Sequence, residues 1–114
     1  MYKPMKDNIV AKELILNLIP SSKENAIKLS EIASYTGLAY RQIKEVISEL
    51  RKSYPICSKE TEGGGYWIAE SSKDIVDFVY MIERRKKGYQ LTIDTMKTHL
   101  SDKEYFKLQG GERT

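Results

Sequence analysis

The stretch from Leu29 to Leu50, LSEIASYTGLAYRQIKEVISEL, constrains the fold of this 114-residue chain more than any other. It contains two amphipathic patterns separated by Thr36-Gly37, and glycine adopts the left-handed conformation that ends a helix without a side-chain penalty. We therefore expect a short helix over residues 31–35, a tight turn, and a longer helix over residues 39–52. Such a helix-turn-helix buries one face of its second helix and presents the other, which can enter the major groove of DNA.

The longer predicted helix is strongly amphipathic. Its apolar residues recur at the i, i+3, i+4, i+7 spacing of a buried stripe, and they are Ile43, Val46, Ile47 and Leu50. The opposite face carries polar and basic side chains, which are Tyr40, Arg41, Lys44, Glu45, Ser48 and Arg51. An ordinary solvated surface has the same pattern, so this helix indicates DNA binding only together with the turn before it and the segment after it.

A β-hairpin is predicted directly after this helix. Tyr54-Pro55 ends the helix, residues 55–59 and 66–69 read as strands, and a glycine cluster at residues 63–65 lies between them. The glycines do not indicate a nucleotide-binding loop, because no lysine followed by serine or threonine comes next and no helix begins there. A helix-turn-helix followed by a two-stranded hairpin forms a winged helix.

The segment before residue 29 predicts a further helix and a short extended stretch. Met1–Asp7 is expected to be a loose arm, and Asn8 can cap a helix that Pro20 ends. Its apolar residues are expected to share one face, and they are Ile9, Val10, Leu14, Ile15, Leu18 and Ile19. Residues 27–29 alternate apolar and polar as a strand does, and Ser30 is expected to cap the next helix.

The C-terminal part predicts one long helix. Apolar residues keep a helical period across Gly88, so we favour a single helix with a bend at Gly88 over two helices that end and begin there. We expect an α+β chain, mainly α, in three parts: a winged helix-turn-helix domain over residues 1–70, a helix for packing or dimerisation over 71–108, and a flexible tail over 109–114. The expected dimer contacts are Phe78, Ile82, Tyr89, Ile93 and Met96.

Composition narrows the function by exclusion. The net charge of +3 is compatible with nucleic acid without requiring it. Cys57 is the only cysteine and His99 the only histidine, so the sequence predicts no disulfide within the chain, no zinc site and no other cofactor. Neither residue has an evident catalytic partner, so we do not expect an enzyme. No signal peptide or membrane span is recognisable, which predicts a cytoplasmic protein.

Residues 27–72 resemble the winged-helix domains found at the N-terminus of biotin operon repressors, and small phage and prophage winged-helix proteins. The residues that carry the resemblance are Thr36-Gly37-Leu38, Arg41, Ile43-Lys44, Ile47, Leu50-Arg51, Pro55-Ile56 and Gly65-Tyr66-Trp67-Ile68. The chain departs from that pattern at Ala39, where such proteins have a serine or threonine cap worth about 1 kcal/mol. Glu60 and Glu62 would also repel phosphates near the tip of the wing.

The resemblance implies sequence-directed binding of double-stranded DNA by a transcription or replication regulator, and a homodimer would cover two half-sites. The expected DNA contacts are Tyr40, Arg41, Gln42, Lys44, Ser48, Arg51, Lys52 and Lys59. Arginine can pair with guanine and glutamine with adenine, whereas the more distant basic residues would contact phosphates. The alternative is an adaptor that binds a replication or transcription protein without touching DNA, since Glu31, Glu45 and Glu49 dilute the positive charge.

Overall fold

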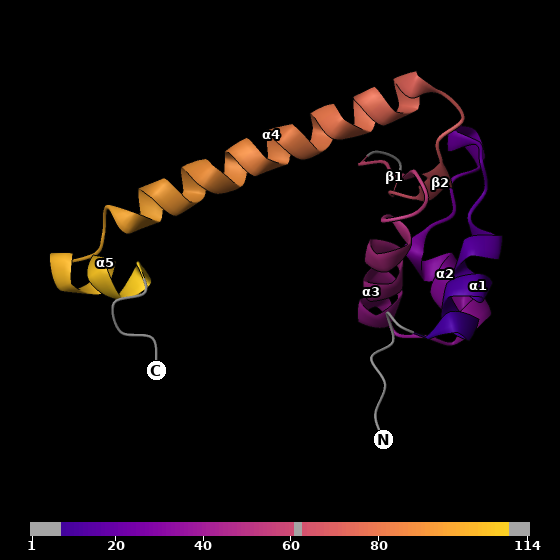
Figure 1. Ribbon diagram of the computed structural model, residues 1–114, viewed down its shortest axis with the longest axis horizontal. Coiled ribbons are helices and arrows are strands. Elements are labelled where there is room, and N and C mark those ends of the chain that lie inside the picture. The colour runs from indigo at the N-terminus through magenta and orange to yellow at the C-terminus, as the bar shows by residue number, and fades with distance from the viewer. Residues whose placement is uncertain (1–7, 61–62, 110–114) are drawn as a thin grey trace. The chain divides into compact units, whose positions relative to one another are not determined.

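The computed structural model of the protein describes residues 8–60 and 63–109 (Figure 1). Its elements in order are α1 (Ile9–Leu18), the short 3-10 helix η2 (Lys23–Asn25), α2 (Leu29–Thr36), α3 (Tyr40–Leu50), β1 (Ile56–Ser58), β2 (Tyr66–Ile68), α4 (Ser72–Lys97) and α5 (Asp102–Leu108). The described chain is mainly helical with a two-stranded antiparallel sheet, as expected for its class. The expected N-terminal arm, Glu62, and the tail beyond Gln109 lie outside the described residues.

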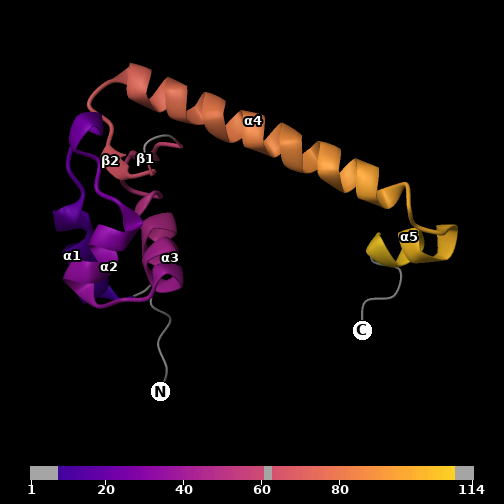
Figure 2. The same ribbon diagram turned by 180° about the vertical axis from the view of Figure 1, so that it is seen from behind.

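The chain divides into two compact units, Met1–Phe78 and Val79–Thr114. In the first unit α1, α2 and α3 pack against one another, with the hairpin of β1 and β2 beside them, as the front and back views agree (Figures 1 and 2). The stripe predicted on α3 is confirmed, because Ile43, Val46, Ile47 and Leu50 are all buried. The other members of this core are Ala11, Ile15, Ile19, Ile27, Ile32 and Ile56.

The apolar face predicted for α1 is only partly correct. Ile15 and Ile19 are buried, but Ile9, Val10 and Leu14 expose between 50% and 66% of their surface. Successive residues of a helix turn by 100°, so Leu14, Ile9 and Val10 point roughly 100°, 120° and 140° away from Ile15 and lie outside the side that it buries. The stripe predicted from sequence was wider than the surface that the core can cover.

Helix ends follow local capping signals. The side chain of Asn8 accepts the Ala11 N–H at 3.1 Å, which confirms the predicted cap of α1. Gly37 ends α2 in the left-handed conformation with φ of 74°, also as predicted. Ser30 is not a cap, however, because α2 begins at Leu29 and the Glu31 carboxylate accepts the Lys28 N–H at 2.9 Å.

The predicted hairpin is confirmed. β1 and β2 pair antiparallel with Cys57 opposite Trp67, and Ile27 adds one bridge, exchanging backbone hydrogen bonds of 2.9 and 2.8 Å with Tyr66. The extended conformation expected around Ile27 is therefore present, although Leu29 already belongs to α2. This bridge ties the chain before α2 to a strand that lies far along the sequence.

The helix predicted over residues 71–108 is continuous through Gly88 but ends at Lys97. A second helix, α5, follows it, so the expectation of one helix up to residue 108 was wrong. Helix α5 begins with a reciprocal cap. Ser101 Oγ accepts the Glu104 N–H at 3.3 Å, and the Glu104 carboxylate accepts the Ser101 N–H at 2.9 Å. This serine-to-glutamate spacing is a signal for the start of a helix that the sequence itself contains.

Asp74 joins the first turn of α4 to the hairpin. Its carboxylate accepts the Glu70 N–H at 3.0 Å and the Trp67 indole N–H at 3.3 Å. These hydrogen bonds, the one from Glu70 first, hold the pKa of Asp74 below its ordinary value of 3.8. The charged form is therefore the one that stabilises the fold.

This lowered pKa predicts a pH-dependent loss of stability. A depressed carboxyl pKa contributes stability above the unfolded value of 3.8, and the contribution is lost as pH falls through the folded pKa. We expect the Asp74→Asn variant to be less stable than the wild-type protein at about pH 6. The difference should shrink as the pH is lowered towards about 2.5, as measured by urea unfolding of both proteins. A difference that stays constant over this range would contradict the assignment.

Candidate nucleic-acid interface

The exposed face of α3 is the candidate interface. It lies opposite the buried stripe and presents Tyr40, Arg41, Lys44 and Ser48, all of which are exposed. Arg41 and Lys44 have no side-chain hydrogen bond or ion pair with any residue in the described ranges. The first turn of α3 contains no acidic residue. A helix N-terminus that lacks an acidic residue favours negative charge nearby, so this face combines two mobile cationic side chains with a favourable helix end.

Gln42, a predicted base contact, makes a local hydrogen bond at the start of α3. Its side-chain oxygen accepts the Ala39 N–H at 2.9 Å, and the residue is only partly exposed. Ala39 has no side chain that could accept a backbone N–H of α3. Of the two hydrogen bonds in a reciprocal cap, only the one from the Ala39 N–H to Gln42 therefore forms at this helix end. A paired contact with adenine needs both the oxygen and the nitrogen of the amide. The prediction that Gln42 reads a base therefore conflicts with the hydrogen bond that it makes here.

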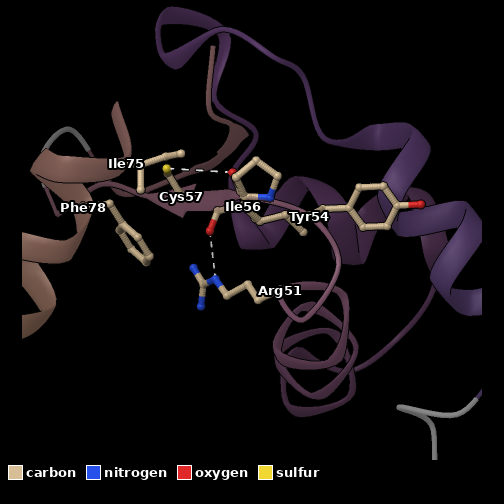
Figure 3. Close-up of a pocket in the computed structure, with 7 residues that line it drawn as sticks. Arg51, Tyr54, Ile56, Cys57, Ile75 and Phe78 are labelled. Atoms are coloured by element: carbon tan, nitrogen blue, oxygen red, sulfur yellow. Dashed lines mark hydrogen bonds between the residues drawn. The ribbon is translucent and has the colours of Figure 1, made fainter. Parts of the chain in front are cut away.

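Arg51, another predicted phosphate contact, also makes hydrogen bonds within the fold. Its Nε donates to the Ile56 carbonyl at 2.9 Å (Figure 3). Its Nη2 donates to Ser58 Oγ at 3.4 Å. The guanidinium carbon lies 5.0 Å from the centre of the Phe78 ring. Arg51 thus ties the end of α3 to β1. Phe78, expected at a dimer interface, is partly buried in this contact.

A small cavity of about 150 Å³ beside Cys57 is also lined by Arg51, Ile56 and Phe78 (Figure 3). Cys57 exposes 1% of its surface, so its thiol is buried. Burial first, and the nearby Asp74 carboxylate second, raise the pKa of Cys57 above its ordinary value of 9.0. The thiol therefore stays protonated and unreactive.

The remaining predicted phosphate contacts are spread along the chain. Lys52 forms an exposed ion pair with Glu49 at 3.0 Å, and the Lys59 N–H donates to the Gly65 carbonyl at 3.0 Å beside the hairpin turn. Lys28 also belongs near this turn, because a Cβ added to Gly63 would lie 3.3 Å from its ammonium nitrogen. Sequence reasoning missed Lys28, since only the bridge between Ile27 and Tyr66 brings it to the hairpin.

Two other kinds of site are not found in the part of the chain that the structure describes. No three histidine, cysteine, aspartate or glutamate side chains gather there as metal ligands, and no helix within residues 8–60 and 63–109 is long and apolar enough to cross a bilayer. A scan against protein-family models and a search of curated proteins give no match to this sequence.

Proposed function

We propose that this protein is a winged-helix protein that binds double-stranded DNA in a sequence-directed way, as a phage, prophage or bacterial regulator of transcription or replication. The observation that carries the proposal is the exposed basic face of α3, held outward by the buried stripe on the same helix. The order of three helices and a hairpin supports the winged-helix assignment. The sequence resemblance described above points the same way.

In this proposal α3 enters a major groove, which is about 12 Å wide and admits a helix. Arg41 lies in the first turn of α3, where an extended guanidinium can pair with the O6 and N7 atoms of guanine. Lys44 lies one turn further along and would contact a base edge or a phosphate. Tyr40 would pack on the sugar-phosphate wall, while Lys28 and Lys59 beside the hairpin turn would contact phosphates.

The test is a salt-dependent binding titration on duplex DNA with the Arg41→Ala/Lys44→Ala variant. The variant removes two positive charges that lie within reach of phosphates, so the slope of log affinity against log salt should fall in magnitude by up to about 2. We expect affinity at low salt to fall at least roughly 10-fold, since the loss of an arginine contact to guanine alone costs about 1–3 kcal/mol. Both residues are exposed, so circular dichroism should show an unchanged fold.

The matched control is Lys73→Ala/Lys103→Ala, which removes the same number of positive charges from exposed sites outside α3. Its affinity should change less than threefold, the size expected for a screened, distant charge pair. Equal losses for the two double variants would mean that net charge, and not α3, determines binding.

A protein-binding adaptor is the second candidate. It is favoured by the apolar side chains that α1 exposes, Ile9, Val10 and Leu14, because neighbouring exposed apolar residues are typical of protein contact sites. Glu45 on the same face of α3 and Glu49 at its flank weaken the positive field in addition. Failure of the wild-type protein to bind random duplex even at low ionic strength would favour the adaptor over DNA binding.

A further inference from the structure

The part of α4 that belongs to the second unit carries an apolar face that the rest of that unit leaves uncovered. Helix α4 is 26 residues long, and Met81 is its only buried residue. Side chains that alternate at spacings of four and three residues form a continuous line, the α4 seam, which consists of Val79, Ile82, Lys86, Tyr89, Ile93 and Met96. The apolar members of this seam expose between 41% and 68% of their surface. A spacing of alternating threes and fours is the a/d pattern of a coiled coil.

The one buried residue of α4 does not compete for this seam. Met81 takes position c of the heptad when Val79 takes a and Ile82 takes d, so it points away from the seam. Gly88 also takes position c, where the absence of a side chain costs the seam no contact. The seam therefore remains open to a partner along its whole length in the described residues.

We propose that α4 pairs through this seam with α4 of a second copy, in an antiparallel two-stranded coiled coil. A homodimer is symmetric, so its axis must relate the two seams by a twofold rotation. If the axis passes between Lys87 and Gly88, Val79 faces Met96 of the second copy and Ile82 faces Ile93. Val79, Ile82, Ile93 and Met96 then each meet an apolar residue, because a positions face d positions in this arrangement.

Lys86 decides the orientation. In a parallel pair in register, the two Lys86 side chains would meet at the same core layer, and like charges held together there are destabilising. In the antiparallel pair each Lys86 instead faces Tyr89 of the second copy, where its stem packs on the ring and its ammonium can lie over the aromatic face. The charged residues at the flanking e and g positions do not face residues of the same charge. Glu83 comes opposite Gln90, both at e positions, and Arg85 comes opposite Thr92, both at g positions.

The paired stretch from Val79 to Met96 is about 26 Å long at 1.5 Å per residue. This is short for a coiled coil, so we expect a reversible dimer whose population rises with protein concentration. The dimer does not depend on DNA binding, because none of the seam residues belongs to the exposed face of α3. Failure of one proposal therefore leaves the other standing.

The orientation is tested by replacing Tyr89 with either charge in the full-length chain. Tyr89→Glu places a carboxylate opposite Lys86 in the antiparallel pair, whereas Tyr89→Lys places an ammonium there. We expect the Glu variant to dimerise at least tenfold more tightly than the Lys variant in sedimentation experiments at low salt, and the difference to shrink as salt is added. A parallel pair would place like charges opposite each other in both variants, so equal dissociation constants would overturn the antiparallel arrangement.

The seam itself is tested by Ile93→Ala with Leu91→Ala as its control. Both residues are exposed in the single chain, Ile93 by 47% and Leu91 by 67%, but only Ile93 lies in the seam. We expect at least a tenfold weaker dimer for Ile93→Ala and an unchanged one for Leu91→Ala, with equal helix content by circular dichroism. A wild-type chain that stays monomeric at the highest accessible concentration, or two variants that behave alike, would overturn the proposal.

Discussion

Replacing Ile43 by alanine should lower the free energy of unfolding of the first unit by about 3 kcal/mol. Ile43 has no exposed surface and lies at the centre of the buried stripe of α3. Alanine removes three carbon atoms from this position and leaves a cavity, because α1 and α2 cannot close on α3 without moving their own buried side chains. The loss is large for a domain of this size, whose total stability is on the order of 5–10 kcal/mol.

The measurement is urea unfolding followed by tryptophan fluorescence. Trp67 is the only tryptophan in the chain and is buried in the first unit, so its emission reports on that unit alone. Ser48→Ala is the control on the same helix, and since Ser48 is exposed we expect a change within about 0.5 kcal/mol. A loss below about 1 kcal/mol for Ile43→Ala would show that this position is not part of a close-packed core.

The elements best predicted from sequence were those fixed by local signals. The stripe of α3 and the end of α2 at Gly37 each depend on residues within one or two helical turns, and both are present in the structure. The hairpin was predicted in the same way, from β-branched and aromatic residues on either side of a glycine cluster. Such signals state what a segment does by itself and need no knowledge of its neighbours.

Predictions failed where the outcome depends on a neighbour or on competing signals. Ile9 looked like a core residue by its chemistry, but the width of the core decides which apolar side chains are covered, and it is 66% exposed. Ser30 was expected to cap α2, yet the hydrogen bond from the Lys28 N–H to the Glu31 carboxylate fixes the start two residues earlier. The break after Lys97 was missed because a continuing apolar period outweighed the cap at Ser101.

The candidate interface was predictable only in part for a related reason. Arg41 and Lys44 could be placed on an exposed face by subtraction, since they lie opposite the buried stripe. The hydrogen bonds of Gln42 and Arg51 could not be predicted, because their partners are the Ala39 N–H and the Ile56 carbonyl, backbone groups of a kind that nearly every residue carries. A sequence shows which side chains are polar or charged but not which of them form hydrogen bonds with the backbone.

Gly65→Ala should destabilise the first unit by about 2–4 kcal/mol, through two effects at one position. Gly65 has φ of 140°, a conformation that residues with a side chain rarely adopt. A Cβ there would also lie 2.9 Å from the Ala26 Cβ and 3.4 Å from the Ala26 backbone. Ala26 directly precedes the residue that bridges to Tyr66, so it cannot move away without disturbing that bridge.

Gly64→Ala separates the two effects. Gly64 also has positive φ, at 82°, but the nearest atom to its added Cβ is 3.6 Å away, an ordinary contact. It should therefore lose only about 1 kcal/mol, the cost of the left-handed backbone. In the Gly65→Ala background, Ala26→Gly should restore part of the lost stability by removing the Cβ nearest to the new side chain. The contrary outcome would be equal losses for the two glycine variants with no recovery from Ala26→Gly. In that case backbone strain alone would require glycine at position 65, and close packing of the hairpin against Ala26 would play no part.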